Sequence, residues 1–398
     1  MKILHVVPSL GHGGGEGLMI ELANRAAADG HEVAVVAGGA LPPERTLKGL
    51  SDSVELKFVS DNYGPKISRY ADMLAWMWRN RRWLSEQDIL HCHMTYAAVL
   101  GSILQIWKRI GGGRRPAVVE TYHAVGMPIP KLYRWFHARM AAQRDALAFM
   151  TENDYWRAFL DKRPHIPFKI ILSGVAPVDV DNVSEQQRLA YRRECGIPDD
   201  CRFVVTTIGR LIAYRMPWLY IPVFARVAER LGDDVHFIMG GDGVEADRVR
   251  ALIQEHGVER QVHMVGLVRQ IELPLAISDV FLSLNLNQWT GVVAFQAASA
   301  RVPLVGVQMQ SEYVARAEDW IWSSSDPEAV AERVVELLQS SEKRAALVQR
   351  QSAYLNEHHS VDAMTRSYYA LYDAALERRS QRLGGQATSF FAGDNPPS

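Results

Sequence analysis

Two arginines near the middle of the chain have the type and spacing needed to bind a diphosphate. Arg210 lies in the segment Ile208-Gly209-Arg210-Leu211, at the end of a strand pattern, and Arg215 follows where a helical pattern starts. A guanidinium offers a planar fork of N–H donors and keeps its charge near neutral pH, so two of them can bind phosphate oxygens in pairs. The alternative is a solvated pair of arginines. We favour the diphosphate clamp, because loops at strand ends face the ligand in open parallel sheets.

A glycine-rich loop, residues 11–15, joins the first strand pattern to the first helical pattern. The N–H groups of Gly13, Gly14 and Gly15 can approach an anion closely, because no Cβ stands in the way. Glu16 follows these glycines and is assigned to the acceptor side of the site. The spacing differs from the GxGxxG pattern of dinucleotide-binding enzymes, which argues against an oxidoreductase. A flexible surface loop is the alternative.

A third candidate segment, residues 288–297, carries two glutamines around a helix start. Gln288 is expected in the loop before the helix, and Gln296 within it, on the same face as Val292. The first N–H groups of a helix lack intrahelical acceptors and favour anions or hydroxyls. The amides expected to point toward a ligand here are those of Thr290, Gly291, Val292 and Val293.

The elements that must position these residues alternate short β-branched runs with amphipathic segments, which is typical of βαβ units. The alternation breaks over 177–187, which we interpret as an interdomain linker. We expect doubly wound domains at 1–180 and 181–358, a helix at 359–380 that crosses back to the first domain, and a disordered tail at 381–398. Strands are expected near 2–7, 31–37, 88–92, 117–122, 146–150, 169–172, 202–208, 235–240, 262–265, 280–284 and 303–307.

Composition limits the class of protein. With 398 residues, 48% hydrophobic and 22% charged residues and a net charge of -1, the chain is expected to be globular and not to bind nucleic acid. Three cysteines without paired spacing support neither a disulfide framework nor a zinc site. The sequence shows no signal peptide pattern and no apolar stretch of membrane-spanning length, so a cytoplasmic protein is expected.

Taken together, these segments resemble family 4 (group 1) glycosyltransferases over nearly the whole chain. The resemblance implies the GT-B fold, an α/β architecture of two facing Rossmann-like domains with an interdomain cleft. It also implies transfer of a sugar from a nucleotide-diphosphate donor with retention at the anomeric carbon and no required metal. The matching segments are Gly13-Gly14-Gly15-Glu16, residues 88–93, Tyr122-His123, residues 169–175, Gly209-Arg210-Leu211, Gly241-Asp242-Gly243 and residues 288–305.

The resemblance assigns roles to individual residues, and some positions depart from the family pattern. His123 matches the family's histidine near the transferred sugar, and Gly209 and Gly241 fall on the donor side. Gln288 and Gln296 stand where the family has glutamates, the first contacting the donor sugar and the second holding the ribose. A neutral amide there has half the acceptor capacity of a carboxylate. The family's usual lysine is replaced by an arginine at position 215, which keeps the positive charge.

A further pair of histidines, His91 and His93, has the two-residue spacing that puts both side chains on one face of a strand. Such a pair resembles part of a metal site, but with no third ligand nearby we expect no metal. We place His93 on the acceptor side instead.

Basic and aromatic residues cluster in the first half of the chain. Such segments fit contact with an anionic membrane, with the rings at headgroup level, and a solvated basic face is an equal alternative. The cluster comprises Lys66, Arg69, Trp76, Trp78, Arg79, Arg81, Arg82, Trp83, Lys131, Tyr133, Arg134, Trp135, Arg139 and Arg144.

The sequence therefore predicts a retaining glycosyltransferase that moves a sugar from a nucleotide sugar to a glycan, lipid-linked or small-molecule acceptor in polysaccharide or glycoconjugate biosynthesis. Arg210 and Arg215 would stabilise the departing diphosphate, while His123 and Gln288 would position the sugar. The alternative is a catalytically silent GT-B protein that serves as a partner of another glycosyltransferase, which the two glutamines motivate. A nucleotide-sugar epimerase ranks third, because no set of acid and base carboxylates is evident.

Overall fold

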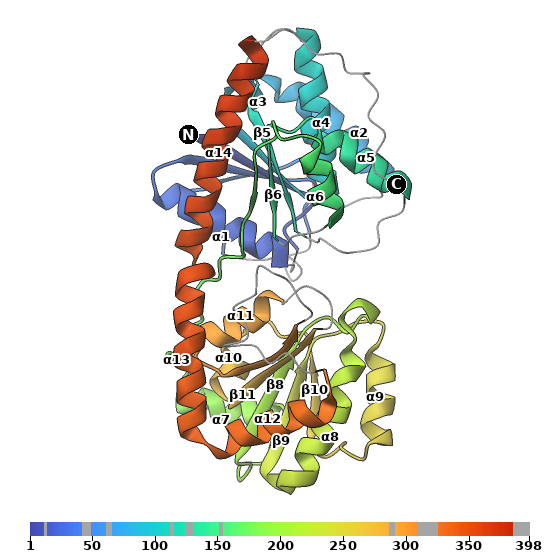
Figure 1. Ribbon diagram of the computed structural model, residues 1–398, viewed down its shortest axis with the longest axis vertical. Coiled ribbons are helices and arrows are strands. Elements are labelled where there is room, and N and C mark those ends of the chain that lie inside the picture. Colours follow the sequence, from blue (N-terminus) through green and yellow to red (C-terminus); the bar gives the residue numbers. More distant parts are fainter. Residues whose placement is uncertain are drawn as a thin grey trace. The chain divides into compact units, whose positions relative to one another are not determined.

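The computed structural model describes residues 1–11, 14–41, 49–60, 66–111, 115–123, 131–150, 154–285, 291–308 and 325–384. Its contacts divide the chain into two compact units (Figure 1). Unit 1 comprises Met1–Gly174 and the C-terminal segment from Val361, and unit 2 comprises Val175–Ser360. None of the described helices is both long and apolar enough to cross a bilayer.

Unit 1 is built on a parallel sheet of seven strands, in the order β3-β2-β1-β4-β5-β6-β7. Its inner strands are apolar runs buried on both faces, as parallel sheets require. The six expected strands are confirmed, and β3 was not expected because most of its side chains are exposed at the sheet edge. The strands are β1 (Lys2–Val7), β2 (Glu32–Ala37), β3 (Glu55–Phe58), β4 (Ile89–His93), β5 (Ala117–Tyr122), β6 (Ala146–Phe149) and β7 (Phe168–Ile170).

Helices cover both faces of this sheet. An apolar cluster that includes Met73, Met77 and Leu100 packs on one face. α1 and α14 pack together, and α14 lies against β5 and β6 (Figure 1). α1 ends at Ala28, and Gly30 two residues later, with a φ of +84°, turns the chain away from the helix. The helices are α1 (Gly14–Ala28), α2 (Lys66–Arg79), α3 (Arg81–Glu86), α4 (Met94–Gly111), α5 (Lys131–Ala141), α6 (Asp154–Asp161) and α14 (Val361–Gly384).

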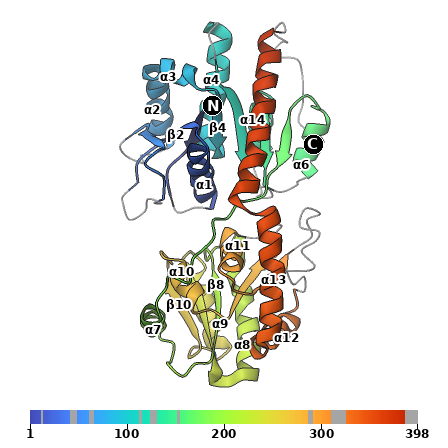
Figure 2. The same cartoon turned by 90° about the vertical axis from the view of Figure 1, so that its left-hand side faces the viewer.

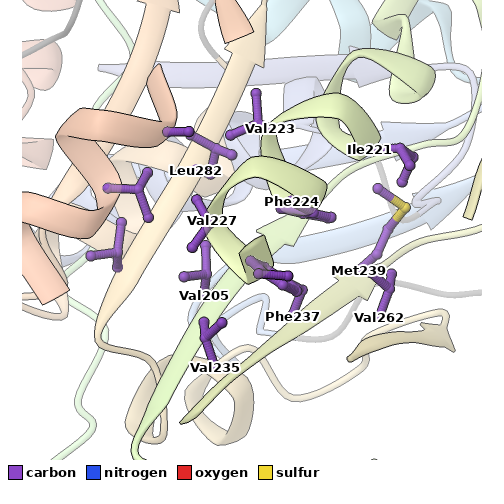
Figure 3. Close-up of a cluster of buried hydrophobic side chains, with 14 of the residues drawn as sticks. Val205, Ile221, Val223, Phe224, Val227, Val235, Phe237, Met239, Val262 and Leu282 are labelled. Atoms are coloured by element: carbon purple, nitrogen blue, oxygen red, sulfur yellow. The ribbon is translucent and has the colours of Figure 1, made fainter. Parts of the chain in front are cut away.

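Unit 2 repeats the architecture with five parallel strands in the order β10-β9-β8-β11-β12. Figure 3 shows its core, where Phe224 and Val227 pack against Val205, Phe237 and Leu282 of the sheet. All five strands were expected, and they are β8 (Phe203–Ile208), β9 (Val235–Gly240), β10 (Val262–Gly266), β11 (Val280–Asn285) and β12 (Leu304–Gln308). The helices are α7 (Glu185–Glu194), α8 (Tyr220–Leu231), α9 (Ala246–Glu255), α10 (Glu272–Ala276), α11 (Val292–Ser299), α12 (Pro327–Gln339) and α13 (Ser341–His358), with α13 beside α11 and α12 (Figure 2).

Both sheets have the strand order of a Rossmann fold, in which each half of the sheet is wound in the opposite direction. The order reverses between β1 and β4 in unit 1 and between β8 and β11 in unit 2. Ligands of such sheets bind beyond the carboxyl ends of the strands at this switch point. These two edges are therefore where the candidate residues must be sought.

The boundaries between the units differ from the expected ones. The chain passes into unit 2 after Gly174 rather than after 180, because Val178 and Val180 already pack against the core of unit 2. The expected linker thus belongs to unit 2, and α7 begins there with a capping box formed by Ser184 and Gln187. The chain returns to unit 1 at Val361 rather than at 359. Residues 381–384 are helical, contrary to the expected tail, and the rest of that tail lies outside the described residues.

Candidate functional site

The loops after β8 and β9 are held together closely at the switch point of unit 2. The N–H of Gly209 donates to the carbonyl of Gly240 (2.9 Å), and the N–H of Leu211 donates to the carbonyl of Asp242 (3.0 Å). Gly241 has a φ of +129°, and a Cβ at this position would lie 1.9 Å from the carbonyl oxygen of Gly209. Only glycine allows this approach. The backbone on either side of Arg210 is therefore fixed by its neighbours.

Arg215 extends from this loop toward the start of α11. It ends a short 3₁₀ turn, Ala213–Arg215, that is followed by Met216 in the left-handed region (φ 46°, ψ 54°). A Cβ built on Gly291, the N-cap of α11, would lie 3.5 Å from a guanidinium nitrogen of Arg215. Because Gly291 has no side chain to cap the helix, the N–H groups of Val292 and Val293 are left to an external acceptor.

The charges at this edge favour an anion. Burial lowers the pKa of Arg215, and the positive charge of Arg210 lowers this pKa further. No carboxylate among the described residues counteracts these two effects on Arg215. Two like charges beside a helix N-terminus form a site that a dianion would stabilise. Gln296 lies half-buried one turn beyond Val292 on α11.

A second group of candidates meets at the carboxyl edge of the sheet in unit 1. A Cβ on Gly15 would lie 3.2 Å from Cγ of His123 and 3.4 Å from the Met94 methyl. The start of α1, the start of α4 and the end of β5 therefore converge. α1 begins at Gly14, so Gly14 and Gly15 form its first turn, whose N–H groups lack intrahelical acceptors. Glu16, also in this turn, is half-buried.

Four histidines lie side by side on the face of the sheet that α14 covers. His5 of β1 bonds to His93 of β4 (Nδ1 to Nε2, 3.1 Å), and His93 bonds to His123 at the end of β5 (Nδ1 to Nε2, 2.9 Å). His91 uses both ring nitrogens in bonds to hydroxyl groups, with Thr121 at 2.7 Å and Tyr372 at 2.8 Å. Tyr372 comes from α14.

Burial keeps these imidazoles neutral. It lowers the pKa of His5 to about 3 and that of His123 to about 4. The pKa values of His91 and His93 also lie well below the ordinary value, first because of burial and then because of the neighbouring histidines. Near neutral pH each ring therefore carries one N–H and one lone pair.

The expectation that no third ligand lies near His91 and His93 is wrong. His5 supplies it, because β1 pairs with β4 and aligns His5 with His91. One ring nitrogen from each of the three lies within 4.8 Å of the others. His91, however, already bonds to two hydroxyl groups, so a metal would have to break one of these bonds. In the structure these rings form a hydrogen-bonded network.

The assignment of Arg144 to an exposed basic cluster is also wrong. Arg144 is fully buried and pairs with Glu120 (Nε to Oε2, 2.6 Å), with further bonds to Gln105, Ala98 and Ser102. Trp76 is buried as well, in the core beneath α2. The basic aromatic surface is therefore smaller than the sequence indicates.

Comparison with protein families shows which family the two units of the chain match. The model described as "Glycosyl transferases group 1" matches residues 188–353, which lie in unit 2, and the model described as "Glycosyltransferase Family 4" matches residues 12–173, which lie in unit 1. The chain belongs to the group 1 glycosyltransferases. This glycosyltransferase thus carries both halves of the family's architecture, in the expected order.

Curated relatives match shorter segments. The phosphatidylinositol N-acetylglucosaminyltransferase GPI3 subunit of Saccharomyces cerevisiae is 26% identical over 110 residues, which is 27% of this chain and 24% of the relative. The N-acetyl-alpha-D-glucosaminyl L-malate synthase of Bacillus anthracis is 22% identical over 155 residues, 38% of this chain and 40% of the relative. The matches thus span less than half the length of these relatives.

Solved structures match over nearly the full length. HepE of Anabaena, in complex with UDP and glucose, has a TM-score of 0.70 at 18% identity and covers 93% of this chain and 98% of its own. The catalytic domain of starch synthase IV from Arabidopsis thaliana, bound to ADP and acarbose, has a TM-score of 0.72 at 12% identity and covers 95% and 99%. These likenesses confirm the GT-B fold. How its two domains face each other stays a prediction.

The candidate residues fall into two groups that the structure brings together and a third that it does not describe. Sequence reasoning missed His5, although a histidine in the first strand and an HxH pattern in β4 were both visible. Gly209, Arg210, Arg215, Gly241, Gly291, Val292, Val293 and Gln296 belong to unit 2, and Gly14, Gly15, Glu16, His93 and His123 belong to unit 1. Gly13, Gln288 and Thr290 lie outside the described residues.

Proposed function

We propose that this glycosyltransferase moves a sugar from a nucleoside-diphosphate donor to a hydroxyl of a glycan, lipid-linked or small-molecule acceptor, with retention at the anomeric carbon. The observation that carries the proposal is the placement of Arg215, half-buried beside Arg210 at the uncapped start of α11. Among the described residues no carboxylate balances Arg215, so these two cations would be stabilised by a ligand that carries two negative charges.

The chemistry follows from the charge that develops on the leaving group. As the bond from the anomeric carbon to the phosphate oxygen breaks, negative charge builds up on the diphosphate, which Arg210, Arg215 and the first amides of α11 would stabilise. The acceptor hydroxyl attacks on the same face that the diphosphate leaves, and its proton passes to a phosphate oxygen. The guanidiniums supply the positive charge for this step, so the proposal requires neither a metal ion nor a side-chain nucleophile.

The remaining candidates would orient the donor. Gln288 and His123 would contact the transferred sugar, and Gln296 would hold the ribose hydroxyls. Gly209 and Gly241 would let the backbone approach the nucleotide. The amides of Gly13, Gly14 and Gly15, with Glu16 nearby, would face the sugar and the acceptor. His93, expected on the acceptor side, is buried and bonded through both ring nitrogens, so it would act there only through His123. Orientation of this kind lowers the barrier by holding the reacting atoms in position.

The matched relatives guide the choice of donors. The names of the curated relatives refer to N-acetylglucosaminyl transfer, and the titles of the solved structures refer to UDP and ADP. UDP- and ADP-linked hexoses and N-acetylhexosamines are therefore the first candidates. The same names motivate a place in polysaccharide or glycoconjugate biosynthesis, because one refers to phosphatidylinositol and the other to an N-acetylglucosaminyl L-malate.

The proposal is tested with the full chain and a panel of nucleotide sugars. One donor should raise the midpoint of thermal unfolding, and release of its nucleoside diphosphate should follow when a glycan or lipid extract is added. Anomeric configuration in the product, read by NMR, should match that of the donor. A donor that binds without any turnover would contradict the transferase and favour the catalytically silent partner. An inverted product would refute the retaining mechanism.

The two glutamines provide a sharper test of whether the native site is complete. A carboxylate close to the diphosphate would repel it, so Gln288→Glu with Gln296→Glu should weaken binding of the nucleoside diphosphate. We expect turnover to fall as well, because the amides are matched to the two arginines. A large gain in turnover would instead mean that the native site is impaired.

A contact with the cytoplasmic face of an anionic membrane is also proposed, on the exposed side of α2. Leu74 and Trp78 lie one helical turn apart and are 50% and 58% exposed. Arg79, Arg81 and Arg82 are exposed next to them, and Arg81 stacks over the ring of Trp78 at 4.8 Å. Apolar side chains surrounded by cations are typical of surfaces that bind anionic headgroups.

Vesicles of phosphatidylcholine with and without phosphatidylglycerol test this contact by co-sedimentation. Binding should require the anionic lipid and should fall when Leu74 and Trp78 are both replaced by serine. Leu267→Ser is the matched control, because Leu267 is 60% exposed in unit 2. Equal binding to both kinds of vesicle, or an equal loss in the control, would refute the proposed surface.

A further inference from the structure

The buried histidines of unit 1 contain two nitrogen atoms that find no hydrogen-bond partner among the described residues. They are Nε2 of His5 and Nδ1 of His123. Buried polar atoms without a partner are rare, so each calls for a physical reason. These two atoms are the opposite ends of one chain of rings, His5–His93–His123, joined by the bonds of 3.1 Å and 2.9 Å.

Counting protons shows that the unpaired ends are unavoidable. Three neutral imidazoles carry three N–H groups and three lone pairs. The two bonds inside the chain use two of each, which leaves one N–H at one end and one lone pair at the other. Only the direction of the two hydrogen bonds can differ: the spare N–H lies either on Nε2 of His5 or on Nδ1 of His123.

Position in the sheet decides this direction. His5 is fully buried in the middle of β1, where no described residue offers its Nε2 an acceptor. An N–H left without an acceptor there pays the full cost of desolvation, whereas an unfilled lone pair is tolerated better. Nδ1 of His123 is buried as well, but His123 follows the end of β5 at the carboxyl edge of the sheet, where a bound ligand can supply an acceptor. The spare N–H therefore belongs on His123.

The position of Nδ1 relative to α1 supports a ligand contact. A Cβ on Gly15 would lie 3.3 Å from this nitrogen, so the ring of His123 packs directly against the first turn of α1. The first turn of α1 also has N–H groups without intrahelical acceptors. A ligand oxygen bound there would accept from both the helix start and the ring.

We propose that His93, itself held by His5, is a positioning residue that fixes His123 in the tautomer with its proton on Nδ1, so that His123 donates a hydrogen bond to an oxygen of the transferred sugar. The identity of that ligand rests on the function proposed above. His91 is not part of this chain, because its two nitrogens bond to Thr121 and Tyr372. No step of the reaction requires the proton to move along the rings.

The tautomer can be read directly in the full chain without any ligand. Histidine labelled with ¹⁵N gives long-range ¹H–¹⁵N correlations that distinguish the two neutral tautomers, and comparison with His123→Gln assigns the signals of His123. We expect Nδ1 to be protonated and Nε2 to be bare. A proton on Nε2 of His123 would overturn the proposal. Added Zn²⁺ that shifts the signals of His5, His91 and His93 together would also overturn it, by showing that these rings bind metal.

Two variants at His93 separate positioning from packing. In His93→Asn the side-chain amide can still donate to Nε2 of His123, whereas His93→Leu removes the donor. We expect kcat for nucleoside diphosphate release to fall roughly three- to tenfold in His93→Leu, about the share of one neutral hydrogen bond, with mixed tautomers in the spectrum. His93→Asn should keep the native tautomer and most of kcat. Equal losses in both variants with an unchanged tautomer would refute the role.

The test distinguishes failure of this inference from failure of the proposed function. If the unmodified protein releases no nucleoside diphosphate from any donor, the function fails, and the spectrum still reports the tautomer. If it turns over a donor while His123 carries its proton on Nε2, the inference alone fails. Should His93→Leu not fold, the native spectrum and the His93→Asn variant still decide the question.

Discussion

Replacing Arg215 with glutamine should separate the stability of unit 2 from its affinity for nucleoside diphosphates. In the ligand-free protein, burial and the charge of Arg210 both disfavour the charged guanidinium of Arg215. Removing that charge therefore relieves an unfavourable interaction, and we expect the free energy of unfolding to stay unchanged or to rise. In the complex, the same change removes a cation from the diphosphate site. Stability and binding should thus move in opposite directions.

The loss of affinity can be estimated from the contacts that Arg215 can make. A hydrogen bond to a charged group contributes about 1.5–3 kcal/mol. Since about 1.4 kcal/mol corresponds to a factor of ten in Kd, Arg215→Gln should weaken binding roughly ten- to hundredfold. Arg215→Lys keeps the charge but loses the planar fork, so its loss should be smaller.

Isothermal titration with UDP and ADP measures the affinity, and urea unfolding measures the stability of the same samples. Arg226→Gln is the matched control, because Arg226 is an exposed arginine of unit 2 that pairs with Glu328 (2.8 Å). The control should bind like the unmodified protein. If Arg215→Gln keeps its affinity within about twofold while folding normally, or if it loses stability without ligand, the reasoning about this pair of charges is refuted.

Three further predictions concern stability. Gly241→Ala, whose Cβ would lie 1.9 Å from the carbonyl oxygen of Gly209, should lower the free energy of unfolding by about 2–4 kcal/mol in urea, whereas Gly209→Ala, which meets nothing within 4 Å, should change it little. Arg144→Leu leaves a buried carboxylate unpaired and should cost about 3–5 kcal/mol, much of which Glu120→Leu in the same chain should restore. Because burial lowers the pKa of the four clustered histidines below 6.5, the unfolded chain binds more protons in acid. The stability of unit 1 is therefore complete above about pH 6.5 and falls as the pH drops below it, by up to about 1.4 kcal/mol per histidine and pH unit. For His5 and His123 this loss continues down to their folded pKa values of about 3 and about 4. A urea midpoint that is flat from about pH 7 to about pH 5 would contradict this.

The sequence predicts most of the parallel strands because strands buried on both faces are continuous apolar runs. Short or exposed elements escape this signal, as β3 shows with its charged, largely exposed residues Glu55–Phe58. Domain boundaries also shift, because the packing of Val178 and Val180 on unit 2 depends on tertiary contacts. Local patterns thus predict the elements well and their junctions less well.

The candidate site divides in the same way. Arg210 and Arg215 could be picked out from residue type and position, but the approach of Arg215 to Gly291 depends on how α11 packs on the sheet. Arg144 was placed on the surface because its partner, Glu120, is 24 residues away in the sequence, on β5. His5 was overlooked for a similar reason, since its role depends on strand pairing between β1 and β4.

Each candidate edge contains a polar group, Arg215 in unit 2 and Nδ1 of His123 in unit 1, whose surroundings are not those that would make the ligand-free protein most stable. A carboxylate beside Arg215 would stabilise unit 2 without a ligand, yet the only charged group that the described residues place against its guanidinium is a second cation, Arg210. A side chain other than glycine at position 15 would crowd the ring of His123, and Nδ1 of that ring has no hydrogen-bond partner among the described residues. Proteins depart from such local rules mainly at functional sites. Since both departures lie at the carboxyl ends of parallel strands, where Rossmann folds bind their ligands, each is best explained by a ligand that completes it.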